Sequence, residues 1–286
     1  MKNIKTIRIL TVLIIVLSLI AGLTGIFSSG AKQYPDVVST FGETIKLYNK
    51  GLYARDSVSM ANQAIGQDIV TVIVGVPLLV VSLLLLNKKK AKGTFLLTGT
   101  IGYFLYTYTS YSFLSTYNHF YLIYVALMAL SFYGFILCIN TINEEEIWKV
   151  FSRNFPVKPL SIFFWVVGLV IGLMWLGRIY PTILSDTAPY GLEQYSTLGI
   201  QTLDLGFIVP AAFISGYLLR KESKWGYIFS VVLVIKAVTM AAAISSMVVV
   251  MRINGISGSI VENFMFPTIL VICLYFMNKL FKEIKE

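Results

Sequence analysis

Residues 226–250 read GYIFSVVLVIKAVTMAAAISSMVVV, an apolar stretch whose single charged residue is Lys236. As a helix, such a stretch is long enough to cross the hydrocarbon core of a bilayer, which requires roughly 20 residues. Lys236 would then lie roughly 15 Å from the membrane edge at Gly226, at the midplane. A lysine there costs at least about 2.5–3.5 kcal/mol. We therefore expect its ammonium group to face the interior of a helix bundle and to meet a carboxylate or a polar cavity.

The rest of the chain has the same character. Of its 286 residues, 57% are hydrophobic and only 13% are charged, about half the charged fraction of a soluble domain. Because lipid cannot satisfy an open backbone, solid apolar blocks indicate helices and not the alternating strands of a barrel. We predict an all-α, polytopic transmembrane bundle of about eight helices. Besides 226–250, the blocks cover 7–28, 68–86, 94–116, 119–140, 161–180, 201–219 and 259–278.

The basic residues predict the orientation. With the N-terminus in the cytoplasm, 16 of the 23 lysines and arginines fall in cytoplasmic segments and six fall outside. This bias predicts that both termini are cytoplasmic. It also explains the net charge of +9 without a nucleic-acid partner. The first apolar block is longer than the core of a signal peptide, which favours a retained helix, with cleavage near residues 28–31 as the alternative.

Two halves are expected, residues 1–140 with an outer loop over 29–67, and residues 161–286, joined by a cytoplasmic linker over 141–160. A shift of 133 residues aligns VPLLVVSLLLLNKKKAKG (76–93) with VPAAFISGYLLRKESKWG (209–226). The same shift places Lys236 opposite Tyr103. The alignment indicates a pseudo-repeat of four plus four helices in the same orientation, as in some transporters.

The sequence lacks the motifs of several common nucleotide-binding, metal-binding and hydrolytic sites. The sequence contains no GxxxxGK[ST], HExxH, CxxC or GxSxG pattern. Its two cysteines and one histidine are too few for most metal sites. We therefore predict no metal, no cofactor and no assigned catalytic residue.

The candidate binding residues surround Lys236 in the predicted topology. Asp204 and Glu262 lie near the outer ends of their helices and are its expected partners in a polar cavity that opens outward. Tyr103 and Tyr106 share a helix face and would form its wall. One alternative to a binding site is a purely structural ion pair between Lys236 and Asp204. The other is that the acids and bases near the helix ends lie among lipid headgroups and bind nothing. The remaining candidates are Asp68, expected to open the second helix, Arg178, expected to close the fifth, and Asn118 and His119 in the turn after the third.

Six segments resemble a group of uncharacterised bacterial multipass membrane proteins. They are GLYARDS (51–57), QDIVTVIVGVPLL (67–79), GYFLYTYTSY (102–111), YNHFYLIYVAL (117–127), LDLGFIVP (203–210) and KWGYIF (224–229), and the likeness extends from about residue 42 to 236. The resemblance implies a multipass protein of a bacterial plasma membrane. It implies no activity, so no functional residue is carried over from it.

The sequence favours a protein that binds or transports a small solute, either anionic or coupled to protons. One alternative is a membrane-embedded enzyme acting on a lipid or lipid-linked substrate, with Asp204 or Glu262 as general base. Another is a non-catalytic sensor or assembly subunit whose outer loop meets a partner protein. Membrane lipids and a small solute are the expected partners, and the sequence indicates neither a particular protein partner nor an oligomeric state.

Overall fold

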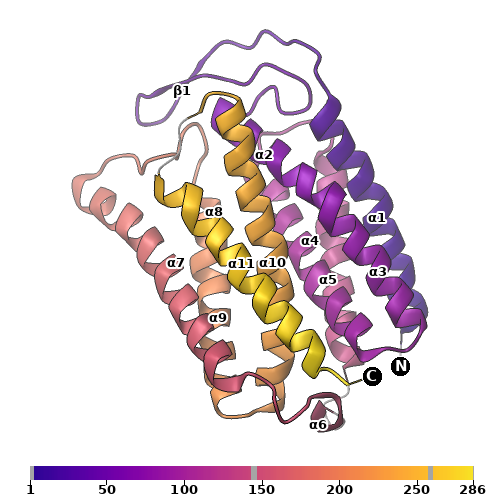
Figure 1. The fold of residues 1–286 in the computed structure, drawn as a ribbon. Helices are drawn as coiled ribbons and strands as arrows, with labels where there is room; N and C mark the ends of the chain where they lie inside the picture. Colours follow the sequence, from indigo (N-terminus) through magenta and orange to yellow (C-terminus); the bar gives the residue numbers. More distant parts are fainter. Residues whose placement is uncertain (1–2, 143–146, 257–259, 286) are drawn as a thin grey trace.

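The computed structural model describes residues 3–142, 147–256 and 260–285 and confirms the all-α bundle (Figure 1). A short two-stranded hairpin, β1 (Val37–Val38) and β2 (Thr44–Ile45), lies in the first loop. Two π-helical turns, η1 and η3, interrupt long helices. The helical elements are α1 (Ile4–Phe27), α2 (Val58–Val70), η1 (Thr71–Gly75), α3 (Val76–Asn87), α4 (Ala91–Leu114), α5 (Tyr121–Thr141), α6 (Ile147–Val150), α7 (Val157–Ser185), α8 (Gly199–Leu203), η3 (Asp204–Ile208), α9 (Val209–Arg220), α10 (Lys224–Ile253) and α11 (Ile260–Glu283).

The described helices make this a multipass membrane protein. Seven stretches within the described ranges are long and apolar enough to cross a membrane: α1, Val58–Asn87, α5, α7, Gly199–Arg220, α10 and Asn263–Glu283. The eighth predicted block is α4, which is rich in tyrosine, threonine and glycine and is largely buried. Other helices surround α4, so its hydroxyl groups can be satisfied by protein instead of facing lipid.

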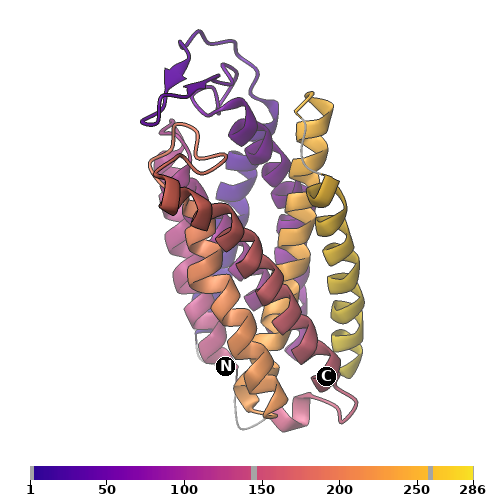
Figure 2. The same ribbon diagram turned by 90° about the vertical axis from the view of Figure 1, so that its left-hand side faces the viewer.

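The bundle has two distinct ends, which both views show. Both chain termini lie at one end, here called the terminal end (Figures 1 and 2). The segment 28–57 with its small hairpin covers the opposite end, here called the loop end. The long helices run between the two ends.

The first loop is shorter than the predicted range 29–67. Helix α2 begins at Val58, where the side chain of Ser57 accepts a hydrogen bond of 3.0 Å from the backbone N–H of Met60. Such a cap satisfies one of the free donors at a helix start. Hydropathy missed this start because the first turns of α2 carry amide side chains. Asp68, predicted to open the helix, therefore lies inside it.

The predicted linker 141–160 is partly helical. It contains α6, and its last residues belong to α7, which begins at Val157; residues 143–146, the acidic part of the linker, lie outside the described residues. The rings of Phe151 and Phe155 pack on Tyr227 with centroid distances of 5.3 and 4.8 Å. These contacts hold the linker against the terminal end of α10. The division of the chain into two domains at this linker stays a prediction.

The repeat seen in the sequence extends to local structure. The shift of 133 residues carries η1 onto η3, α3 onto α9 and the first residue of α4 onto that of α10. Each π-helical turn directly precedes a Val-Pro pair, at 76–77 and at 209–210. π-helical turns are rare and occur frequently at functional sites. Their recurrence at equivalent positions indicates one structural unit used twice.

The turns at the terminal end also repeat. Lys89 and Glu222 occupy equivalent positions and both adopt the left-handed backbone region, with φ of 57° and 53°. Gly93 and Gly226 follow at the same spacing. A Cβ at Gly93 would lie 2.6 Å from a backbone nitrogen of the preceding helix, and one at Gly226 would overlap the equivalent nitrogen. Only glycine allows such a close approach, which explains why the alignment includes both positions.

Helix α10 joins the two halves. It packs against α9 and α11 of its own half and against α2 and α4 of the other. The contact with α2 is a close backbone approach, because a Cβ on Gly66 would lie 2.5 Å from the Cα of Met247. Small residues permit such contacts between membrane helices. Lys236, near the middle of α10, is therefore held where the two halves meet.

Candidate functional site

The ammonium group of Lys236 lies inside the bundle. The side chain is only 8% exposed, and its Nζ lies 4.1 Å from the centroid of the Tyr106 ring on α4. A cation over an aromatic face gains about 0.5–2 kcal/mol, more when water is excluded. The carboxylate of Asp204 also acts on the ammonium electrostatically. Lys236 thus contacts one aromatic ring and lies within the electrostatic influence of one acid.

Both carboxylate oxygens of Asp204 accept hydrogen bonds. The hydroxyl of Tyr106 donates to Oδ1 at 2.7 Å, and the indole N–H of Trp175 on α7 donates to Oδ2 at 2.9 Å. Tyr106 therefore contacts both charges, the lysine through its ring and the aspartate through its hydroxyl. We call Lys236, Tyr106, Asp204 and Trp175 the Lys236 cluster. It combines three helical segments of the second half with α4 of the first.

The repeat explains where the two charges sit. Thr71 begins η1, and its hydroxyl lies 2.9 Å from that of Tyr103. The shift of 133 residues carries Thr71 onto Asp204, which begins η3, and Tyr103 onto Lys236. One pair of positions thus holds two neutral hydroxyls in the first half and two opposite charges in the second.

Arg178 extends the Lys236 cluster toward the loop end. It lies one turn after Trp175 on α7, with its guanidinium 5.6 Å from that ring and 5.1 Å from the ring of Tyr190. It also donates a hydrogen bond to the carbonyl of Tyr190. Helix α7 continues past Arg178 to Ser185, so the arginine does not end the helix as predicted. A second cation therefore lies between the loop end and Lys236.

Asp68 belongs to a separate group. Its Oδ2 accepts a hydrogen bond of 2.5 Å from the hydroxyl of Tyr53, and its Oδ1 accepts one of 3.0 Å from that of Tyr111. Tyr111 follows Tyr106 by five residues on α4, a rotation of about 140° around the helix. The two acids therefore lie on different sides of α4. We call Asp68, Tyr53 and Tyr111 the Asp68 group.

Tyr103 belongs with α2 and η1 and not with Lys236. Gln67 donates hydrogen bonds to the hydroxyls of Tyr103 and Thr107, at 2.7 and 2.9 Å. Together with Thr71 these residues form a buried polar network inside the first half. The two predicted wall tyrosines, Tyr103 and Tyr106, thus have different partners.

The remaining candidates lie at the loop end. Asn118 stabilises the turn between α4 and α5, where its Oδ1 accepts a hydrogen bond of 2.9 Å from the backbone of Phe120. His119 in the same turn is exposed. Glu262 falls in the first turn of α11, but its side chain lies outside what the structure describes. None of these three is placed with Lys236 by the contacts described.

Three residues of these sites were missed from the sequence. Trp175 and Tyr111 lie in predicted helices, but nothing in their spacing distinguishes them from core or interface aromatics. Tyr53 lies in the first loop, where no periodicity indicates which side chains turn inward. One weak signal existed for Trp175, its position one turn before Arg178.

Two acids, the buried Asp56 and the half-buried Glu193, join the segments of the loop end. Asp56 accepts hydrogen bonds from the backbone of Thr116 at 2.8 Å and from the hydroxyl of Tyr195 at 3.0 Å. The hydroxyl of Ser57 donates to Glu193. These bonds join segment 28–57 to the α4–α5 turn and to the loop 186–198, and we call them the cap contacts. Burial raises the pKa of the Asp56 carboxyl and of the Glu193 carboxyl.

The cap contacts are expected to weaken as the pH rises. Opening the cap would return Asp56 and Glu193 to water and to their ordinary pKa values of about 4. The closed cap binds protons more tightly, so it is most stable below those values and loses stability as the pH rises through the raised ones. Hydrogen exchange of backbone amides in loop 186–198, corrected for intrinsic pH dependence, should show protection that falls with pH.

The double variant Asp56→Asn with Glu193→Gln serves as the control for this pH dependence. It keeps the shape of both side chains and removes both titrations, so protection should become insensitive to pH. Protection that increases with pH in the unmodified protein would contradict the expectation.

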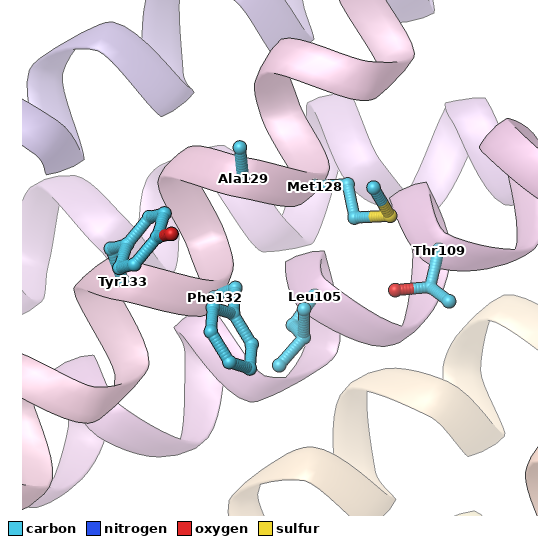
Figure 3. A pocket seen from close by; sticks show the side chains of 6 residues that line it. All are labelled: Leu105, Thr109, Met128, Ala129, Phe132 and Tyr133. Atoms are coloured by element: carbon cyan, nitrogen blue, oxygen red, sulfur yellow. The ribbon is translucent and has the colours of Figure 1, made fainter.

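A pocket on the side of the bundle is distinct from both sites. It lies between α4 and α5 and is lined by mostly apolar side chains without a charged group (Figure 3). Phe132 and Tyr133 on its rim are exposed, so the pocket opens on the lateral surface. Its chemistry suits an acyl chain of a surrounding lipid. The lining residues are Leu105, Thr109, Met128, Ala129, Phe132 and Tyr133.

No family model matches the chain, and no curated protein or solved structure shows significant similarity to it. The resemblance to bacterial multipass proteins therefore stays a prediction.

Proposed function

We propose that the protein binds a small anionic solute at the Lys236 cluster and transports it across a bacterial plasma membrane. The observation that carries the proposal is the ammonium of Lys236, buried in the middle of a membrane-spanning helix and held against an aromatic face. An ion in this position is costly and is usually retained for a function.

The buried ammonium favours an anion. Lys236 contributes a positive charge at the bundle centre, with one acid, Asp204, near it. Arg178 contributes a second positive charge toward the loop end, where the acid Glu193 acts on it. The contact of Lys236 with Tyr106 gains about 0.5–2 kcal/mol. A hydrogen bond between the ammonium and an anion gains about 1.5–3 kcal/mol. An anionic solute would give the ammonium a charge-assisted hydrogen bond, which the aromatic face does not supply.

The fold supports movement across the membrane. The bias of basic residues supports a cytoplasmic terminal end, which puts the loop end outside. A solute would then pass Arg178 before it reaches Lys236. The two π-helical turns lie at equivalent points of the two halves, and interrupted helices at repeat interfaces are where transporters bind substrates and move.

The test is stabilisation by anions. Purified protein in lipid nanodiscs is heated with single carboxylates, inorganic phosphate or sulfate, each compared with its neutral analogue or with chloride. A ligand present at 100 times its Kd stabilises the folded state by about 2.7 kcal/mol. We expect at least one anion to raise the melting temperature and to exchange across proteoliposomes.

Lys221→Met is the matched control for Lys236→Met. Lys221 also lies over a tyrosine ring, 5.9 Å from that of Tyr217, but at the end of α9. Stabilisation by the anion should persist in Lys221→Met and disappear in Lys236→Met. Stabilisation by cations or neutral solutes alone, or an equal response of both variants, would overturn the proposal.

A further inference from the structure

Asp68 is buried in a membrane-spanning helix and differs from Asp204 in its surroundings. It is 1% exposed, and helix α1 covers it so closely that a Cβ on Gly25 would overlap its Oδ2. Its hydrogen-bond donors are two phenols, Tyr53 and Tyr111. Removing an ionised carboxylate from water costs several kcal/mol, which two neutral donors offset only in part.

The titratable groups that face Asp68 in the described part of the chain are all phenols. Helix α1 presents glycine, and α10 approaches α2 through the backbone of Met247 at Gly66. Asp68 therefore has no cation near it among the described residues, whereas Asp204 has Lys236. The phenols are Tyr53 from the first loop, Tyr103, Tyr108 and Tyr111 from α4, and Tyr124 from α5.

Two of these phenols indicate space for a polar ligand. The hydroxyls of Tyr108 and Tyr124 are buried and interact electrostatically with Asp68. The hydroxyl of Tyr108 has no hydrogen-bond partner among the described residues, and that of Tyr124 has only the side chains of Tyr53 and Asn118 beside it, without a well-formed hydrogen bond. The rings of Tyr108 and Tyr124 pack on Tyr111 with centroid distances of 5.8 and 5.1 Å. A buried hydroxyl without a partner costs about 1–3 kcal/mol. The pair therefore marks a place beside the carboxyl where a water or a hydrated proton would be stabilised.

We propose that Asp68 is a proton-binding site, separate from the Lys236 cluster, that is loaded from the loop end through the hydroxyl of Tyr53. Tyr53 belongs to the cap segment 28–57 at the loop end. Its own side chain is 1% exposed, so a proton reaches it only when the cap segment, in which Arg55 is already exposed, opens. A hydronium ion gives a proton to the oxygen of Tyr53. The O–H bond of Tyr53 breaks as its own proton moves to Oδ2 of Asp68. A water molecule, a neutral phenol and a neutral carboxyl remain.

Binding of a proton at Asp68 does not depend on the proposed function. Coupling of that proton to the movement of a solute does rest on it. Helix α4 contacts both groups, because Tyr106 bonds to Asp204 and Tyr111 bonds to Asp68. Neutralising Asp68 weakens the bond that it accepts from Tyr111. A change at Asp68 can therefore reach the Lys236 cluster through one helix.

Infrared difference spectroscopy tests the site without any solute. Protein in nanodiscs is compared at acidic and alkaline pH, and the C=O stretch of a protonated buried carboxyl is followed. The measurement uses the Asp56→Asn, Glu193→Gln background, because those two carboxyls also have raised pKa values. We expect a band that disappears as the pH rises, is absent when Asp68→Asn is added and is kept when Asp204→Asn is added. A titrating band kept in Asp68→Asn, or no titrating band in this background, would overturn the proposal.

Tyr53→Phe provides a second test that removes a hydroxyl but no charge. The Asp68 band should move to higher frequency, and its exchange with deuterium should slow by about 100-fold, the lower limit for a positioned proton-transfer group. Tyr117→Phe, a change of an exposed tyrosine at the same end, should alter neither. An unmoved band and an unchanged rate in Tyr53→Phe would refute loading through Tyr53.

Discussion

Lys236→Met is expected to lower the free energy of unfolding by about 2 kcal/mol, and Asp204→Asn in the same chain should restore part of it. The main loss is the contact of a buried ammonium with the Tyr106 ring, which contributes about 2 kcal/mol when water is excluded. The attraction to Asp204 adds less, because Asp204 is half-buried and keeps its donors Tyr106 and Trp175. Unfolding monitored by circular dichroism in mixed micelles measures both variants.

This pair of variants also separates structure from function. Methionine and asparagine approximate the replaced shapes, so the double variant should fold, but it should not bind the anion, since the ammonium is gone. Lys221→Met should change stability by no more than about 0.5 kcal/mol. If the two substitutions at the Lys236 cluster simply add, the two charges do not stabilise each other.

Gly66→Leu should destabilise the protein by about 3 kcal/mol or more. A Cβ at this position would lie 2.5 Å from the Cα of Met247 and 2.7 Å from its nitrogen. Backbone atoms cannot rotate away as a side chain can, so α2 and α10 must separate. Overpacking typically costs about 1–3 kcal/mol, and more where nothing yields. The yield of folded monodisperse protein and its melting temperature measure the effect.

Gly177→Leu is the matched control for this substitution. Gly177 also lies within a membrane-spanning helix, but no heavy atom lies within 4 Å of a Cβ built there. Its replacement should leave the melting temperature nearly unchanged. Equal losses in both variants would show that the α2–α10 contact does not decide stability.

Much of the fold could be predicted because membrane helices follow from local rules. Lipid forces each apolar block to be a helix, so the positions of the blocks follow from composition. The shift of 133 residues was also visible, and the structure adds the paired π-helical turns and the paired left-handed residues. The start of α2 was the main error, because polar side chains that face inward resemble a loop in a hydropathy profile.

The candidate site was only partly accessible from the sequence. Lys236 stood out because its cost in a membrane is independent of its neighbours. Its contacts with Tyr106 and Asp204 join α10 to α4 and η3, and no spacing along the chain encodes which helix faces meet. Tyr103 and Tyr106 were expected to line the same cavity, but Tyr103 bonds to residues of the first half and Tyr106 to Asp204 of the second. Side chains three residues apart on a helix differ in direction by about 60°, which is enough for them to face different neighbouring helices.

The sequence by itself determined that this chain crosses a membrane repeatedly and that one lysine lies where water is scarce; it indicated a repeated unit, to which the structure adds the paired turns. These properties depend on the transfer of each segment from water to lipid, which is additive along the chain. Only the tertiary structure decided that Asp68 and Asp204 lie in two separate groups, one surrounded by phenols and the other accompanied by a cation. That difference arises from which helices meet, and packing between distant segments decides it.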